Sequence, residues 1–270
     1  MCLAVLIPVL YFSEYVPVVI ILAALSCVAV FEISCCFGID PGDPFIIPWY
    51  AAAAALPFLV RYWPGPALLK AALSVGGLMV IYGFSYATLS RGRLRFSRAA
   101  SAMLFIAYVL AGVNCILIVR DNAPYSGRFM FMLILLGAWV TDAGAQFSGI
   151  AFGKHKLIEE VSPHKTVEGA IGGAVCGVAG YVVYCLAVRG IYHVQIRWVP
   201  LIILGVVIAV TDQLGDLIAS YVKREFGIKD YGWLFPGHGG AVDRLDSIVS
   251  NAIVIASYIV LGLPGIFITR

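Results

Sequence analysis

Stretches of about 20 apolar residues recur along the whole sequence, and each is long enough to cross a hydrocarbon layer of about 30 Å as an α-helix. A single soluble core cannot accommodate so many of them. The composition agrees, because 61% of the 270 residues are hydrophobic and only 12% are charged. Soluble domains usually carry about 25% charged residues. The sequence therefore predicts an all-α, polytopic transmembrane helical bundle.

We expect eight full spans and a partial helix at the N-terminus. The apolar run at residues 2–12 would extend only about 16 Å as a helix, roughly half of a bilayer. It lacks the basic segment and the small-residue cleavage site of a signal peptide. We therefore expect that the recorded start lacks the first part of a ninth helix. The full spans are predicted at residues 16–37, 45–61, 67–88, 99–119, 128–150, 167–189, 198–222 and 247–267.

The distribution of Lys and Arg predicts how these spans are oriented. The loops at residues 89–98, 151–166 and 223–246 fall on one side of the membrane and hold eleven basic residues, whereas the opposite side holds six. By the positive-inside rule, the richer side is cytoplasmic. We therefore expect a multi-pass protein of the cell (inner) membrane with these three loops in the cytoplasm.

Charge and cysteine usage argue against several other classes of site. The net charge is +3 and the basic residues lie in short loops, which predicts no nucleic-acid partner. The seven cysteines lie in apolar segments without CxxC pairs, so we expect them to be small packing residues. The four histidines form no zinc signature of the HExxH kind.

The acidic residues are unevenly distributed along the chain. Only five of the fifteen precede residue 140, and the long polar loops follow it. We therefore expect an N-terminal transmembrane scaffold at residues 1–127. The C-terminal catalytic region would cover residues 128–270, with the cytoplasmic loops 151–166 and 223–246.

The span predicted at residues 198–222 carries polar side chains on one face. At 100° per residue, an arc of about 80° holds four of them: Asp212, Asp216, Ser220 and Lys223. An Asp near a bilayer centre costs about 2.5–3.5 kcal/mol, so such acids normally line a cavity and carry function. The alternative is a structural Asp–Lys pair. For Glu32, alone near a helix end, we expect a local helix contact instead of a site.

Three chemical types follow this span within a short distance. Gly237, Gly239 and Gly240 would let the backbone approach a phosphate closely and offer N–H donors. Lys and Arg would neutralise phosphate oxygens, and carboxylates are the hard oxygen ligands that Mg²⁺ prefers. Taken separately, the glycines indicate only a turn and the acids only a helix start. Together they predict a phosphate-handling metal site.

A second polar cluster lies at residues 139–172. Asp142 falls inside a predicted span, Ser162-Pro163 is expected to start the next helix, and Glu168 falls in the first turn of that helix. Lys165 is harder to explain by capping, because a cation at a helix N-terminus opposes the macrodipole. We therefore expect Lys165 to serve an anion.

These residues form one long run, which reads Ser220-x2-Lys223-Arg224-x4-Lys229-Asp230-x5-Pro236-Gly-His-Gly-Gly240-x2-Asp243-Arg244-x-Asp246. The run resembles the full signature of the phosphatidate cytidylyltransferase (CDP-diacylglycerol synthase) family, with every fixed position filled. Residues 162–169 also resemble that family, and the similarity covers roughly residues 130–260. One departure is Gln146, where the family pattern has Tyr; it bears on local packing or a substrate contact and leaves the reaction unaffected.

The resemblance implies that a lipid phosphate attacks the α-phosphorus of CTP. Phosphatidic acid and CTP would give CDP-diacylglycerol and pyrophosphate for phospholipid biosynthesis. It also implies a homodimer and a two-cation site that holds Mg²⁺ with a second, monovalent cation such as K⁺. Asp216 and Asp243 would bind the Mg²⁺ and Asp246 would be a further ligand, with Asp142 and Asp212 as additional candidates.

The remaining site residues fall into two expected groups. The catalytic group would hold phosphates and comprises Lys165, Lys223, Arg224 and Arg244, with Asp246 beside them. The nucleotide-binding group comprises Ser220, Lys229, Gly237, His238, Gly239 and Gly240.

Two other functions remain open from the sequence. A CTP-dependent lipid-alcohol kinase of the polyprenol type would share the membrane setting and the nucleotide, but it would release CDP instead of pyrophosphate. A cation-coupled transporter would use Asp142, Asp212 and Asp216 as an ion path. It would leave the Lys, Arg and Gly residues of the 223–246 loop without a role.

Overall fold

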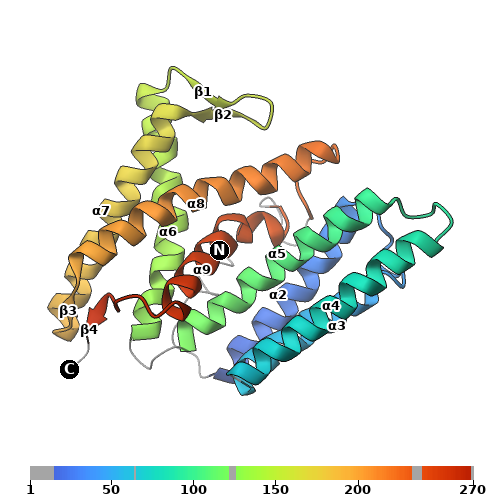
Figure 1. Ribbon diagram of the computed structural model, residues 1–270. Helices are drawn as coiled ribbons and strands as arrows, with labels where there is room; N and C mark the ends of the chain where they lie inside the picture. Colours follow the sequence, from blue (N-terminus) through green and yellow to red (C-terminus); the bar gives the residue numbers. More distant parts are fainter. Residues whose placement is uncertain (1–14, 64, 122–125, 233–238, 269–270) are drawn as a thin grey trace. The chain divides into compact units, whose positions relative to one another are not determined.

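The computed structural model describes residues 15–63, 65–121, 126–232 and 239–268, and helices dominate it (Figure 1). The apolar run at residues 2–12 lies outside the described residues. Eight helices occur in the described part of the chain: α2 (Tyr15–Cys36), α3 (Ile47–Tyr62), α4 (Pro66–Leu89), α5 (Phe96–Asp121), α6 (Ser126–Phe152), α7 (Val167–Tyr192), α8 (Trp198–Glu225) and α9 (Val242–Val260).

Each of the eight predicted spans overlaps one of these helices, which confirms the all-α, polytopic fold. Six of the described helices are long and apolar enough to cross a membrane: α2, α4, α5, α6, α7 and α8. The other two, α3 and α9, have 16 and 19 residues. At 1.5 Å per residue these would be about 24 and 28 Å long, so the total of eight spans remains a prediction.

Large apolar side chains point outward along these helices. Leu78 on α4, Leu104 on α5 and Val183 on α7 are 65%, 74% and 66% exposed. Exposed apolar surface on this scale is unfavourable in water, whereas lipid tails are as apolar as these side chains. The outer surface is therefore that of a multi-pass membrane protein.

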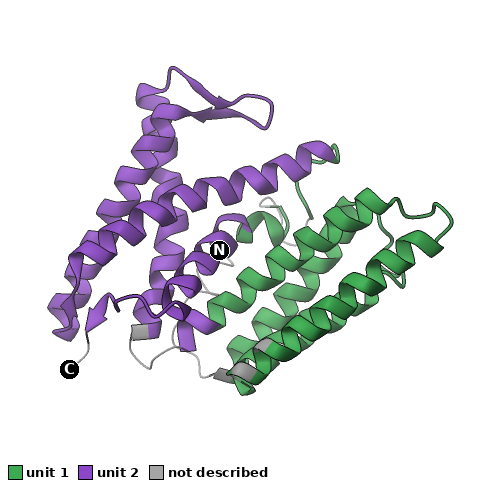
Figure 2. Ribbon diagram, viewed as in Figure 1, with its two compact units in different colours: residues 1–117, 226–245 green, residues 118–225, 246–270 purple. Residues whose placement is uncertain are grey.

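The chain forms two compact units (Figure 2). Unit 1 contains residues 1–117 and 226–245, and unit 2 contains residues 118–225 and 246–270. The segment after α8 therefore belongs with the first helices of the chain. The functional division expected between residues 127 and 128 remains a prediction.

In unit 1, aromatic rings anchor the segment that follows α8. Phe226 lies with its ring centroid 4.3 Å from that of Phe37, just after the end of α2. Tyr231 stacks on Phe105 of α5 at 5.7 Å. Aromatic pairs at these separations stabilise beyond their buried area, so residues 226–231 are held against α2 and α5.

In unit 2, helices α6 and α7 pack closely because small residues line their contact. Gly169, Gly173 and Gly177 recur every fourth residue on α7 and are all buried. A Cβ atom at Gly173 would lie 2.8 Å from the carbonyl oxygen of Thr141, and one at Gly144 would lie 2.4 Å from Cβ of Cys176. Small residues let membrane helices approach closely, and the packing role expected for Cys176 is confirmed.

Two short β-ladders were not expected from the sequence. Strands β1 (Lys156–Ile158) and β2 (Ser162–Thr166) form an antiparallel hairpin between α6 and α7. Strands β3 (Gln195–Ile196) and β4 (Phe267–Ile268) also pair antiparallel. The prediction that Ser162-Pro163 starts a helix is wrong, because both residues lie in β2 and α7 begins at Val167.

The last helix is displaced from its predicted range of 247–267, since α9 runs from Val242 to Val260. It ends at a turn in which the N–H groups of Leu261 and Gly262 donate to Ser257 and Ile259. Gly262 has a φ of +66°, a left-handed value that glycine adopts at little cost and that commonly ends helices.

Candidate functional site

The polar face predicted on α8 is present in the structure. Asp212 is fully buried, whereas Asp216, Ser220 and Lys223 are partly exposed toward the C-terminal end of the helix. The Ser220 hydroxyl donates to Oδ1 of Asp216 at 3.4 Å, one turn away. The face therefore runs from a buried carboxylate to an accessible cation.

Lys165 from the end of β2 forms an ion pair with Asp216, between Nζ and Oδ2. The two side chains are 26% and 27% exposed, so the pair is partly shielded from water. This contact joins the two polar clusters that the sequence analysis found separately. The anion that Lys165 meets in this structure is a carboxylate of the protein.

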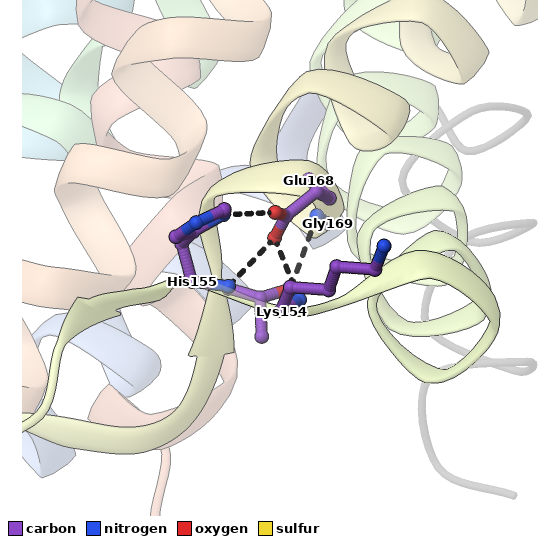
Figure 3. A network of polar contacts seen from close by, with 5 residues as sticks. Lys154, His155, Glu168 and Gly169 are labelled. Carbon is purple, nitrogen blue, oxygen red and sulfur yellow. Dashed lines mark hydrogen bonds and ion pairs between the residues drawn. The ribbon is translucent and has the colours of Figure 1, made fainter.

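A hydrogen-bond network at the base of the hairpin joins Lys154 and His155 to the start of α7 (Figure 3). Oε2 of Glu168 accepts the backbone N–H groups of Lys154 and His155 at 3.1 and 3.2 Å, and Oε1 lies 2.6 Å from Nδ1 of His155. Oγ1 of Thr166 caps α7 by accepting the N–H of Gly169 at 3.1 Å. Glu168 lies in the first turn of α7, as predicted, and it ties the start of the hairpin to that helix.

Deeper in unit 2, Asp212 lies in a buried polar cluster. Its Oδ1 accepts a hydrogen bond from Nδ2 of Asn251 at 2.7 Å. Its Oδ2 is buried and has no hydrogen-bond partner among the described residues. A buried carboxylate oxygen without a donor is costly, which marks this position as unusual for a purely structural side chain.

Other charged residues lie within electrostatic range of this position. Asp142 on α6 and Asp246 on α9 are within range of Asp212, and Asp216 and Lys223 are within range of Asp246. Unit 2 therefore brings together four acids and two lysines predicted for the site. The acids are Asp142, Asp212, Asp216 and Asp246, and the lysines are Lys165 and Lys223.

The donor set of unit 2 fits Mg²⁺ by its chemistry. In the part of the chain that the structure describes, no three His, Cys, Asp or Glu side chains are grouped closely enough to form a metal cage. Mg²⁺ does not require one, because it usually binds through one or two carboxylates, water and substrate phosphates. Of the acids predicted as metal ligands, Asp216 and Asp246 of this unit are partly exposed and could hold it, and Asp142 is exposed.

In unit 1, Asp243 links Tyr231 to Gly240, two residues on either side of the described gap in the glycine-rich segment. Asp243 is buried, and its Oδ2 accepts the N–H groups of Tyr231 at 2.8 Å and Gly240 at 3.0 Å. Gly239 has a φ of +82°, which explains a glycine at that position. Gly237 and His238 lie outside the described residues, so their predicted contacts with a nucleotide remain predictions.

Glu32 is a residue of this region that the sequence reasoning missed. Its carboxylate accepts the N–H groups of Ala241 and Val242, both at 2.9 Å, at the start of α9. The expected local helix contact is therefore wrong. A lone acid inside an apolar span requires a hydrogen-bond donor, and this was visible in the sequence. The sequence does not show that the donors are the N–H groups at the start of α9.

The remaining cations of the signature lie at the surface. Arg224, Lys229 and Arg244 are exposed in their respective units. The Nε atom of Arg224 donates to the carbonyl oxygen of Val161 in the hairpin at 3.4 Å. Exposed cations can meet an anion that arrives from water. Gln146, the departure from the family pattern, is also exposed on α6.

Comparison with known proteins identifies the family of this chain. Residues 1–261 match the model of the Cytidylyltransferase family. A phosphatidate cytidylyltransferase of Staphylococcus saprophyticus subsp. saprophyticus is 36% identical over 187 residues, which cover 69% of this chain and 67% of that protein. The Staphylococcus haemolyticus protein of the same name is 34% identical over 194 residues, covering 72% and 70%. That of Staphylococcus epidermidis is 39% identical over 165 residues, covering 61% and 60%. The chain therefore belongs to the cytidylyltransferase family.

Proposed function

We propose that this chain transfers a cytidylyl group from CTP to phosphatidic acid, giving CDP-diacylglycerol and pyrophosphate for phospholipid biosynthesis. Its curated relatives are named phosphatidate cytidylyltransferase. The observation that carries the proposal is the ion pair between Lys165 and Asp216, which joins the two stretches that resemble the family. It links a phosphate-binding cation to the helix that opens the signature.

The reaction requires charge neutralisation more than covalent chemistry. An oxygen of the lipid phosphate forms a bond to the α-phosphorus of CTP, and the bond from that phosphorus to the oxygen bridging to the β-phosphate breaks. Pyrophosphate leaves with the bonding electrons. Both reactants are anions, so positioning and positive charge supply most of the catalysis. Lys165, Lys223, Arg224 and Arg244 are the cations that we assign to phosphate binding.

Mg²⁺, when bound, would neutralise phosphate charge and withdraw electrons from the reacting phosphorus. Asp216 and Asp246 of unit 2 are the proposed ligands. For Asp243, the proposed metal-binding role comes from the resemblance alone. Asp142 and Asp212 are further candidate ligands and would add negative charge to the site. A second, monovalent cation such as K⁺ is proposed from the resemblance alone, and a titration of activity with KCl at constant ionic strength tests it.

We further propose that the site faces the cytoplasm of the cell and that the protein is a homodimer. The excess of Lys and Arg in three loops supports the orientation, since basic loops stay on the cytoplasmic side. Phosphatidic acid keeps its acyl chains in the bilayer, while CTP arrives from the cytosol. Protease access to the hairpin at residues 153–166 in inside-out vesicles tests the orientation, and chemical cross-linking in membranes tests the dimer.

The decisive experiment measures pyrophosphate and CDP released from CTP by detergent-purified protein, with and without phosphatidic acid and Mg²⁺. We expect pyrophosphate release that requires both. Asp243→Asn should abolish it, whereas Glu160→Gln, which removes an exposed acid in the hairpin, should not. CDP as the product would favour a lipid-alcohol kinase. If folded protein released neither pyrophosphate nor CDP, both enzyme activities would be excluded.

A further inference from the structure

The carboxylate of Glu32 holds the start of α9 from a distant part of the chain. Glu32 lies one turn before the end of α2 and is only 3% exposed. Oε1 accepts the N–H of Ala241 and Oε2 accepts that of Val242, each at 2.9 Å. The first N–H groups of a helix have no partner within it, and a negative charge there is stabilised by the helix dipole. Glu32 therefore serves as a cap that α2 supplies to α9.

Two glycines also lie against this carboxylate. A Cβ atom at Gly232 would be 2.3 Å from Oε1 of Glu32, and one at Gly240 would be 2.5 Å from both carboxylate oxygens. Both residues have φ values outside the left-handed region. Glycine is therefore required at these positions by contact and not by backbone conformation. Gly232 and Gly240 therefore both lie against the Glu32 carboxylate, although they are eight residues apart in the sequence.

Asp243 binds the same part of the chain, because its carboxylate accepts the N–H groups of Tyr231 and Gly240. The two ends of the glycine-rich loop are thus held by two buried carboxylates of unit 1. Asp243 and Gly240 belong to the signature, whereas Glu32 and Gly232 lie outside it. Glu32, which the signature does not contain, therefore contacts the backbone beside the signature residues Gly240 and Asp243.

We propose that Glu32 is a positioning residue for the cytidylyl transfer, which holds Gly240 and Asp243 in the geometry needed to bind the nucleotide. This inference rests on the proposed function. It predicts that loss of the Glu32 carboxylate changes nucleotide binding, beyond any effect on folding.

The first test compares Glu32→Gln with Ser34→Ala. The Gln amide has a similar size but only one acceptor oxygen, so one of the two N–H groups faces an NH₂ group. We expect the KM for CTP to rise about tenfold while the KM for phosphatidic acid changes less than about twofold. Ser34 is a matched control, because it is buried on α2 and donates to Phe31 within the same helix. A lower kcat with both KM values unchanged would mean a smaller folded fraction only, and would overturn the proposal.

The second test is a pair of double-mutant cycles measured by thermal unfolding in detergent. Gly232→Ala and Gly240→Ala are each made in the wild-type and Glu32→Ala backgrounds. We expect each glycine substitution to lower the Tm clearly in the wild type and little in the Glu32→Ala background, because the clashing carboxylate is gone. Equal losses in both backgrounds would contradict the contact.

The two failures can be told apart. Wild-type protein that is folded but releases no pyrophosphate from CTP and phosphatidic acid would overturn the proposed function, and with it the role of Glu32 in catalysis. The unfolding cycles need no activity, so coupled losses of Tm would still establish the contact between Glu32 and the two glycines. Active wild type with an unchanged KM for CTP in Glu32→Gln would overturn the positioning role alone.

Discussion

Lys165 and Asp216 form an ion pair that ties the β1–β2 hairpin to α8. Each side chain is only about one quarter exposed, and Nζ of Lys165 is itself buried. Removing two charges from water costs free energy that offsets much of their attraction, so such a pair is weak evidence for a role in stability. The contact keeps a cation and a carboxylate together at the place where we propose that phosphates and Mg²⁺ bind.

Replacing Lys165 should impair catalysis without unfolding the protein. Lys165→Met keeps the length of the side chain and removes its charge, and we expect kcat/KM to fall about 100-fold because phosphate stabilisation is lost. Lys154→Met is the matched control, because it removes a charge from the same loop while keeping the backbone N–H that Glu168 accepts. Steady-state kinetics of pyrophosphate release check both variants. A similar fall in kcat/KM for Lys165→Met and Lys154→Met would mean that the net charge of the loop matters and that Lys165 has no specific role.

Removing divalent metal should stop the reaction reversibly. We expect EDTA to abolish pyrophosphate release and added Mg²⁺ to restore it. Asp216→Asn should raise the Mg²⁺ concentration needed for half-maximal rate about tenfold, because one charged oxygen ligand is replaced by a neutral one. Magnesium titrations of the two proteins provide the measurement. Full activity of the wild type in EDTA would exclude the metal.

Asp212 should behave differently from Asp216. Asp212→Asn keeps an oxygen that can accept from Asn251, so we expect the Tm to be unchanged or higher and activity to remain within about threefold. Asp212→Leu removes the acceptor of the shorter hydrogen bond of the buried Asn251 amide and leaves it only the 3.5 Å bond to the Ile134 carbonyl oxygen, so it should destabilise by about 1–3 kcal/mol. Thermal unfolding in detergent distinguishes the two. Inactivity of a well-folded Asn variant would instead make Asp212 a direct participant in the site.

The close contact between α6 and α7 should not tolerate larger residues. In Gly173→Ala the new methyl group would lie 2.8 Å from the Thr141 carbonyl oxygen. Overpacking of this kind typically costs about 1–3 kcal/mol, which should be visible as a lower Tm. Gly76→Ala on α4 is the control, because no atom lies within 4 Å of its Cβ position. That substitution should be neutral or slightly stabilising, since Ala favours a helix by about 1 kcal/mol over Gly.

The sequence predicted the helices well, because a bilayer requires a long apolar segment for each crossing and such segments are visible without any tertiary information. It was less successful at the end of the chain. Residues 261–267 are apolar enough to extend a helix, but the left-handed turn at Gly262 and the pairing of β4 with β3 end it earlier. Local hydrophobicity does not report pairing with a distant strand.

The residues that we propose for the site were likewise visible in the sequence, since charged residues are rare in membrane segments and these occur at fixed spacings. Their partners were not. Three contacts all join residues on different elements: the pairing of Lys165 with Asp216, the hydrogen bond of Asn251 to Asp212 and the capping of α9 by Glu32. Residue type and spacing thus determined the fold class and the chemistry, whereas only the packing of helices decided which buried charge meets which donor.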